Sequence, residues 1–168
     1  MIESEYVQQY HCPRWDELPG IPLYMDQVIM VINEALSVFS DHGEPILTRA
    51  MINNYVKHKI ITPPEKKKYQ RKHIAQLIVL SLCKKVFSMS EIRTITRIVA
   101  DHFGMEAAYD LFCHKLEAML RIGFSPERAT LTMTQSESPA EQLLEQVLVS
   151  LICRLMVQYD LAAREAGE

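Results

Sequence analysis

Apolar residues recur at intervals of three and four along most of this chain, the spacing that places them on one side of an α-helix. Capping residues stand at the start of several of these stretches, and glycine or proline stands near their ends. The pattern predicts helices at residues 26–39, 48–59, 72–86, 88–103, 105–123 and 138–163. A mainly α-helical fold is therefore expected.

Four of the predicted helices begin with a recognisable cap. Asp26 and Thr48 precede the first two, and Ser88 with Glu91 forms the spacing of a capping box. Ser138 precedes the last helix, with Pro139 at its first position. Residues 1–24 hold three of the eight prolines and show no period, which predicts an irregular arm. Residues 124–137 are read either as a loop or as a short helix followed by extended chain.

The predicted helix at residues 48–59 has an apolar and a polar side. Its apolar side consists of Ile52, Tyr55 and Val56. Its polar side consists of Arg49, Asn53 and Lys57, each four residues after the last, with Asn54 alongside. The apolar side is expected to face the core, and the polar side is expected to face solvent or a polar partner.

Two short extended stretches follow this helix. The β-branched run at residues 60–62 and the stretch around Tyr69 flank Pro63-Pro64-Glu65, a segment typical of a turn. This arrangement predicts a β-hairpin that presents Lys66, Lys67 and Lys68 at its tip.

Charge is distributed unevenly along the sequence. Between Arg49 and Lys85 there are ten Lys or Arg residues and one acid, Glu65, so this segment carries +9 although the whole chain carries −3. Such separation indicates a surface for a polyanion, above all nucleic acid. A charged surface that is merely solvated is the alternative.

The order helix, turn, helix, basic hairpin, helix is that of a winged helix-turn-helix, which reads double-stranded DNA. Side chains expected to contact bases are those of the polar helix side, because Asn suits adenine and Arg or Lys suits guanine: Arg49, Asn53, Asn54 and Lys57. Basic side chains of the hairpin and its flank are expected to contact phosphates: Lys59, Lys66, Lys67, Lys68, Arg71 and Lys72.

Residues 47–92 carry a family resemblance. A capped helix with Tyr55, the Ile60-Ile61 and Pro63-Pro64 turn, Tyr69 in the hairpin and the run VFSMSEI at residues 86–92 resemble, in this order, the DNA-binding head of MerR-type regulators. The stretch from NNYVK to YQRKHIA is even more similar to bacterial proteins grouped as DUF1836. The MerR resemblance implies a winged helix-turn-helix that binds DNA.

Other chemistry is weakly represented in the sequence. His11-Cys12 and Cys113-His114 are the adjacent pairs suited to a metal, but neither has ligand spacing, so no metal site and no cofactor are predicted. The chain contains neither a nucleophile elbow nor a phosphate-binding glycine loop, so an enzyme is not expected. Four widely spaced cysteines, an acidic N-terminus and the lack of a long apolar run predict reduced thiols, a cytoplasmic location and no membrane span.

The predicted organisation has three parts. Residues 1–24 form the arm, residues 25–103 form a MerR-like winged helix-turn-helix, and residues 104–168 form a helical region whose last helix pairs two copies. The expected function is sequence-specific binding of double-stranded DNA by a dimeric transcriptional regulator. A helical protein–protein interaction module without DNA binding is the alternative.

Overall fold

Helices account for most of the computed structural model, which describes residues 4–41, 43–127, 130–165 and 167. The helices are α1 (Ser4–Gln8), α2 (Met25–Ala35), α3 (Arg49–Lys57), α4 (Arg71–Cys83), α5 (Met89–Phe103), α6 (Met105–Gly123) and α7 (Pro139–Glu165). The shorter elements are the 3₁₀ helices η1 (Trp15–Glu17) and η2 (Ser37–Phe39) and the strands β1 (Leu23–Tyr24) and β2 (Lys68–Tyr69). The expectation of a mainly α-helical fold is confirmed.

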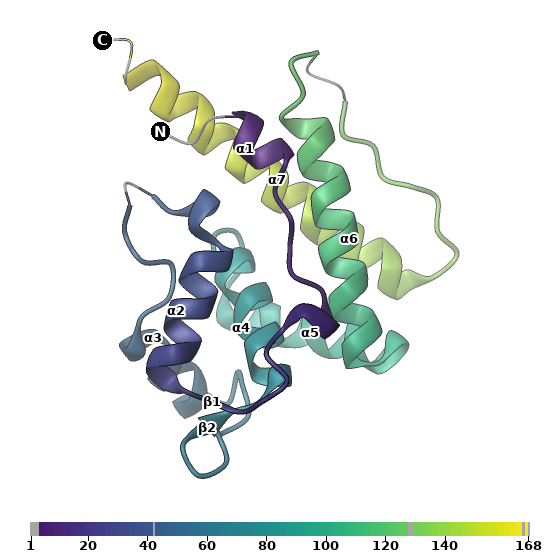
Figure 1. The fold of residues 1–168 in the computed structure, drawn as a ribbon. Coiled ribbons are helices and arrows are strands. Elements are labelled where there is room, and N and C mark those ends of the chain that lie inside the picture. The colour runs from purple at the N-terminus through teal and green to yellow at the C-terminus, as the bar shows by residue number, and fades with distance from the viewer. Residues whose placement is uncertain (1–3, 42, 128–129, 166, 168) are drawn as a thin grey trace.

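The helix α4 lies at the centre of the molecule. Figure 1 shows α2, α3 and the strand pair on one side of it, and α5, α6 and α7 on the other. Its sequence, RKHIAQLIVLSLC, is apolar around most of the helix, and nine of its thirteen residues are buried. A helix that is hydrophobic all round requires cover on every side, which explains its position.

Three of the predicted caps, at Thr48, Ser88 and Ser138, are found where the sequence placed them. The Thr48 Oγ1 accepts a hydrogen bond from the N–H of Met51 at 3.3 Å and starts α3. Ser88 and Glu91 form the expected capping box of α5, and the Ser138 Oγ accepts from the N–H of Glu141 at the start of α7. Each cap supplies an acceptor for a backbone N–H that the helix itself leaves unpaired.

The arm is more ordered than its sequence suggested. It contains α1, η1 and β1, and it buries Val7, Cys12 and Leu18. Hydrogen bonds to α6 fix its path: the Trp15 N–H donates to the Asp110 carboxylate at 2.7 Å, and the Tyr109 hydroxyl donates to the Pro13 carbonyl at 2.7 Å. The prediction of an irregular arm is therefore only partly right, because these contacts to distant residues do not appear in a local pattern.

The strand pairing differs from the predicted hairpin. The strand β2 pairs antiparallel with β1, so Tyr69 lies opposite Leu23 and Lys68 opposite Tyr24. Residues 60–62 form no strand, and Ile61 is buried in the core instead. The tip of the predicted hairpin is present as a tight turn, because Glu65 and Lys68 form an isolated antiparallel bridge.

Boundaries of the other helices shift by a few residues. The helix α2 begins at Met25 with Tyr24 as its N-cap, so Asp26 lies in its first turn, and η2 replaces its predicted last turn. The described residues of 124–137 contain neither helix nor strand, which agrees with the prediction of a loop.

By length and composition alone, α7 is apolar enough to cross a membrane, a property that core helices of soluble proteins share.

One hydrophobic core connects the whole molecule. It includes Leu18 from the arm, Ile52 and Ile78 from the middle of the chain, and Leu116 and Leu148 from the last two helices. The predicted division of the chain into three parts, with boundaries at residues 24 and 103, stays a prediction.

Candidate nucleic-acid interface

The helix α3 is anchored by one side and exposed on the other. Ile52 and Tyr55 are buried against the core. The Lys84 ammonium group donates a hydrogen bond to the Tyr55 hydroxyl at 3.5 Å. Asn53 and Asn54 are exposed, as is Lys57. The helix therefore presents two carboxamides and an ammonium group to solvent, all of which can bond to base edges.

A lysine in an uncommon backbone conformation ends this helix. Lys59 has φ 56°, and the next residue, Ile60, donates its N–H to the Tyr55 carbonyl at 2.8 Å. This is the hydrogen-bond pattern of a Schellman motif, where glycine is the usual residue. The Lys59 side chain is exposed directly after the polar side of α3.

The turn that joins Glu65 to Lys68, which we call the basic turn, places two further lysines at its tip. Lys66 has φ 48° and Lys67 has φ 62°, and the Lys68 N–H donates to the Glu65 carbonyl at 2.9 Å. Positive φ at both central residues is the requirement of a type I′ turn, which Asn-Gly satisfies at the least cost. Lysine at both positions stores strain at an exposed, charged site.

The helix α3 and the basic turn are connected through α2 and the strand pair. Arg49 at the start of α3 pairs with Asp26 at the start of α2. Burial raises the pKa of Tyr69, and the guanidinium of Arg49 partly opposes this shift, so Arg49 also lies near β2. Lys68 Nζ lies 5.1 Å from the centroid of the Tyr24 ring.

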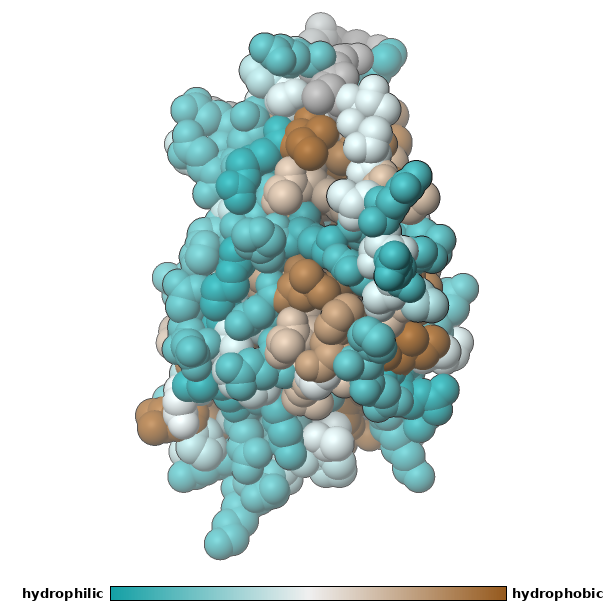
Figure 2. Space-filling view, turned by 90° about the vertical axis from the view of Figure 1, so that its right-hand side faces the viewer, coloured by the Kyte–Doolittle hydropathy of each residue, from teal (hydrophilic) through white to brown (hydrophobic). Residues whose placement is uncertain are grey.

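The two elements therefore occupy the same end of the molecule. Figure 1 shows α3 and the turn beside the strand pair, far from the C-terminal end of α7. The same end carries mostly hydrophilic side chains that extend outward in Figure 2.

A buried histidine holds the loop between α3 and the basic turn. The Gln70 N–H donates to His73 Nδ1 at 2.9 Å, and His73 Nε2 lies 3.0 Å from Thr62 Oγ1. Burial lowers the pKa of His73, and the adjacent Lys72 ammonium lowers it further, which favours the neutral ring. The neutral ring accepts with Nδ1 and donates with Nε2, so it satisfies both partners.

Some of the basic residues in this region have internal partners. Arg49 pairs with Asp26, Arg71 lies 3.5 Å from Asp16, and Lys85 lies 3.1 Å from Asp41. Lys84 points inward, where its Nζ bonds to the Ile46 carbonyl at 3.1 Å. Within the described part of the chain, six lysines have no acidic partner: Lys57, Lys59, Lys66, Lys67, Lys68 and Lys72.

The structure thus gathers the residues predicted to contact DNA, but not all equally. Six are exposed and we call these the basic face: Asn53, Asn54, Lys57, Lys59, Lys66 and Lys67. Lys68, Arg71 and Lys72 are half-buried, and Arg49 is exposed but paired. Tyr24 and Asp26 join this surface without having been predicted, because only the fold brings β1 and α2 next to α3.

A second cluster lies where the arm meets α6. Glu117 is buried and accepts hydrogen bonds from Arg14 Nη1 at 2.8 Å and from the Cys12 N–H at 2.9 Å. The Sγ atoms of Cys12 and Cys113 lie 3.0 Å apart; this contact and burial raise the pKa of Cys113. Both thiols are free and buried. Within the described residues no group of three or more metal ligands occurs.

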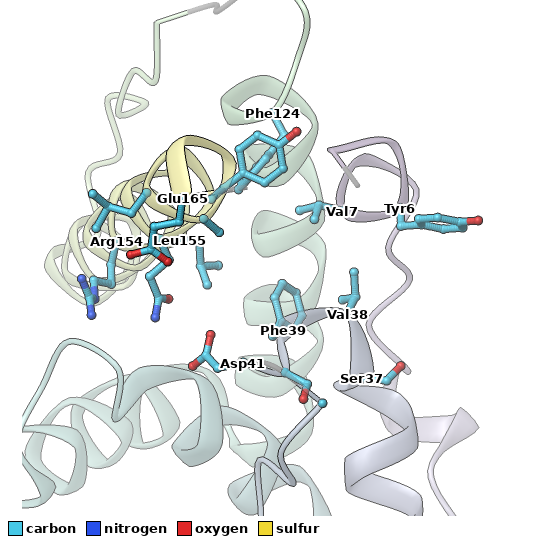
Figure 3. A pocket seen from close by; sticks show the side chains of 16 residues that line it. Tyr6, Val7, Ser37, Val38, Phe39, Asp41, Phe124, Arg154, Leu155 and Glu165 are labelled. Carbon is cyan, nitrogen blue, oxygen red and sulfur yellow. The ribbon is translucent and has the colours of Figure 1, made fainter. Parts of the chain in front are cut away.

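A cleft of about 930 Å³ lies at the end of the molecule opposite the basic face. Figure 3 shows Val7 of α1, Phe39 of η2 and Leu155 of α7 around the same space, whereas Tyr6 points away from it. Arg154 lies on its α7 wall and has no hydrogen-bond or ionic partner among the described residues. Its walls are mainly apolar, and it shares no lining residue with the basic face.

The fold and the basic face define the class first: a mainly helical domain with a small antiparallel strand pair and a concentrated cationic surface. Comparison with known families then places the chain. A family model described as domain of unknown function (DUF1836) matches residues 13–112, and the chain belongs to this family. No curated protein and no solved structure matches it. The matched range contains the whole basic face and ends within α6.

Proposed function

We propose that the chain binds double-stranded DNA through its basic face, in the manner of a winged helix-turn-helix related to MerR-type regulators. The observation that carries this proposal is the set of six lysines at residues 57–72 without an acidic partner among the described residues, beside the exposed carboxamides of α3. A carboxylate partner offsets the electrostatic potential of an ion-paired lysine. These lysines have no such partner, so their positive potential is available to attract phosphates.

The two parts of the basic face serve different roles in this proposal. Asn53, Asn54 and Lys57 on α3 contact base edges in the major groove, and Lys59 with the basic turn contacts phosphates. Arg49 contributes only after it exchanges Asp26 for DNA. Lys68, Arg71 and Lys72 support the phosphate contacts from the flank.

A binding measurement with a turn variant tests the phosphate role. Lys66→Asn/Lys67→Gly removes two charges but installs the residues that the positive φ angles favour. If both lysines contact phosphates, the slope of log K against log salt concentration falls by about 2 in magnitude, for all DNA fragments alike. Mobility shift on genomic fragments at several salt concentrations measures this slope.

The matched control is Arg154→Gln, which removes an exposed charge on α7 remote from the basic face. Unaltered binding and an unaltered slope are expected for it. Equal losses for this variant and the turn variant would show that only net charge matters and would refute the proposed face.

Base contacts are tested separately with Asn53→Ala. Asn53 is exposed and makes no side-chain hydrogen bond within the described chain, so its removal leaves the fold intact. Loss of about 1–3 kcal/mol of preference between bound and unbound fragments is expected, with little change in nonspecific binding. A variant that retains the full preference would contradict the placement of α3 in the groove.

The protein is further proposed to act as a dimeric regulator in the cytoplasm, with α7 as the contact between copies. Cys153, Val157 and Leu161 recur every four residues on α7 and are all exposed. Two linked heads would bind two half-sites, which supplies the contact area that one small head lacks.

A protein–protein interaction module is the second candidate. Ile21, Tyr24 and Met30 are exposed large hydrophobic residues on or next to β1 and α2, and such side chains favour a protein partner. Absence of any DNA binding at low salt would favour this candidate over the first.

A further inference from the structure

A second, smaller cavity lies behind the basic face. It has a volume of about 270 Å³ and lies between α4, α5, α6 and α7, next to the end of α3. Its walls are apolar: Val79, Ile92, Ile95, Val99, Phe112 and Val147. An apolar cavity of about 150 Å³ is enough to bind benzene, so this one has room for a ring with a short chain or for a branched aliphatic chain.

The polar residues at this cavity carry one sign of charge. Lys59, Arg93 and Arg97 line it, and none of its lining residues is acidic. The two arginines lie four residues apart on α5 and are both exposed, and no described acid pairs with any of the three cations. Three unpaired cations beside apolar walls favour an anion that is attached to an apolar body.

An amide oxygen without a hydrogen-bond partner belongs to a residue that lines the same cavity. Gln76 of α4 lines it, and the Gln76 Oε1 is buried without a hydrogen-bond partner. Buried polar groups of this kind are normally satisfied, so an unpaired one calls for a ligand or water. Because a carboxamide can rotate by 180°, Gln76 offers either an acceptor or a donor.

The wall also contains Cys83, which does not add a negative charge. Burial raises the pKa of its thiol to about 12, so the thiol is neutral at physiological pH. It therefore acts as a small apolar wall residue.

We propose that this cavity binds a small organic acid, with its apolar part between α4, α5 and α6 and its carboxylate at Arg93, Arg97 and Lys59. Gln76 bonds to a polar atom of the bound acid. This cavity is a separate site from the basic face proposed to bind DNA, although Lys59 belongs to both.

The site is tested on the full chain in the absence of DNA, so that its outcome is independent of the proposed function. Isoleucine methyl groups are labelled for NMR and the protein is titrated with phenylacetate and 4-methylpentanoate. Shifts are expected at the methyl groups of Ile60, Ile92 and Ile95, which line the cavity, but not at the exposed Ile122 on α6.

Neutral amides of the same shape separate charge recognition from apolar filling. Phenylacetamide and 4-methylpentanamide are expected to bind at least about tenfold more weakly than the acids, since they lose charge-assisted hydrogen bonds. The variant Arg93→Gln/Arg97→Gln is expected to lower the affinity for the acids to that for the amides. Arg154→Gln is the matched control and leaves acid binding unchanged.

A cavity-filling variant provides an independent readout. Ala100→Leu on α5 is expected to abolish the shifts caused by acids and amides alike, with thermal unfolding used to show that it is folded. The proposal is overturned if neither acid shifts the cavity methyl groups at about 10 mM, which would saturate a site with a Kd of about 1 mM. It is equally overturned if acids and amides bind alike or if the arginine variant binds the acids normally.

Discussion

At the scale of single residues, Glu117 is a side chain of α6 that holds the arm through several hydrogen bonds. It is 7% exposed and binds Arg14 and the backbone of Cys12, so a single carboxylate ties residues 12–14 to α6. Desolvation raises the pKa of Glu117, but the hydrogen bonds from Arg14 and Cys12 outweigh it and the pKa is lowered. The charged form is therefore the one that stabilises the fold.

Replacing Glu117 by Gln is expected to lower the free energy of unfolding by about 2 kcal/mol, because the partly buried Arg14 loses its charged partner. Chemical denaturation monitored by circular dichroism measures this loss. Glu34→Gln is the matched control, since Glu34 is exposed on α2 and is expected to change stability by less than about 0.5 kcal/mol.

The same carboxylate predicts a pH dependence. Because the folded-state pKa lies below the ordinary value of 4.5, the stabilisation is complete above that value and is lost as the pH falls through the folded-state pKa. The stability of Glu117→Gln is expected to fall less steeply than that of the wild type below about pH 4.5. Identical slopes for the two proteins would contradict the role assigned to Glu117.

At the scale of elements, the basic turn combines strain with charge. The left-handed conformation of a residue other than glycine costs about 1 kcal/mol, and the turn contains two such lysines. Natural proteins retain such strain where a side chain serves a function. The proposed phosphate contacts provide such a function for Lys66 and Lys67.

The turn variant Lys66→Asn/Lys67→Gly is therefore expected to raise the free energy of unfolding by about 1 kcal/mol while it weakens DNA binding. Thermal and denaturant unfolding of the variant and the wild type measure the stability change. A variant that is less stable than the wild type would show that the two lysines stabilise the turn. It would contradict the view that they lower stability in exchange for phosphate contacts.

The elements themselves differ in how far the sequence could define them. The caps at Thr48, Ser88 and Ser138 were predicted correctly because a cap is a local hydrogen bond between residues three apart. The partner of β2 was predicted wrongly because Leu23 lies 46 positions before Tyr69, and a local pattern does not specify such a pairing. Residues 60–62 have the composition of a strand, but tertiary packing directs Ile61 into the core.

At the scale of the whole molecule, the unpartnered stripe of α7 bears on the oligomeric state. Val157 is 50% exposed and Leu161 is 53% exposed, in a helix whose buried residues pack against α4, α5 and α6. Exposed apolar residues in a row on one helix are typical of a contact with another chain. The proposed dimer places a second copy on this stripe.

Val157→Glu/Leu161→Glu is expected to convert the dimer into a monomer, because it places charges in the apolar contact. Size-exclusion chromatography with light scattering reports the mass, which should equal two chains for the wild type and one for the variant. Gln146→Glu, at an exposed position of the same helix, should leave the dimer intact. A wild-type protein of single-chain mass at high concentration would refute the proposed contact.

The sequence by itself determined the six longer helices α2 to α7, the caps at Thr48, Ser88 and Ser138, and the concentration of charge between Arg49 and Lys85, since these depend on neighbours within a few positions. Only the tertiary structure decided which of those charges remain unpaired, because Asp16, Asp26 and Asp41 reach their basic partners across 23 or more positions of the chain. It likewise decided that the arm completes the strand pair and that a cavity opens behind α3. These features arise from the packing of segments far apart in the sequence, which the periodicity of one segment does not encode.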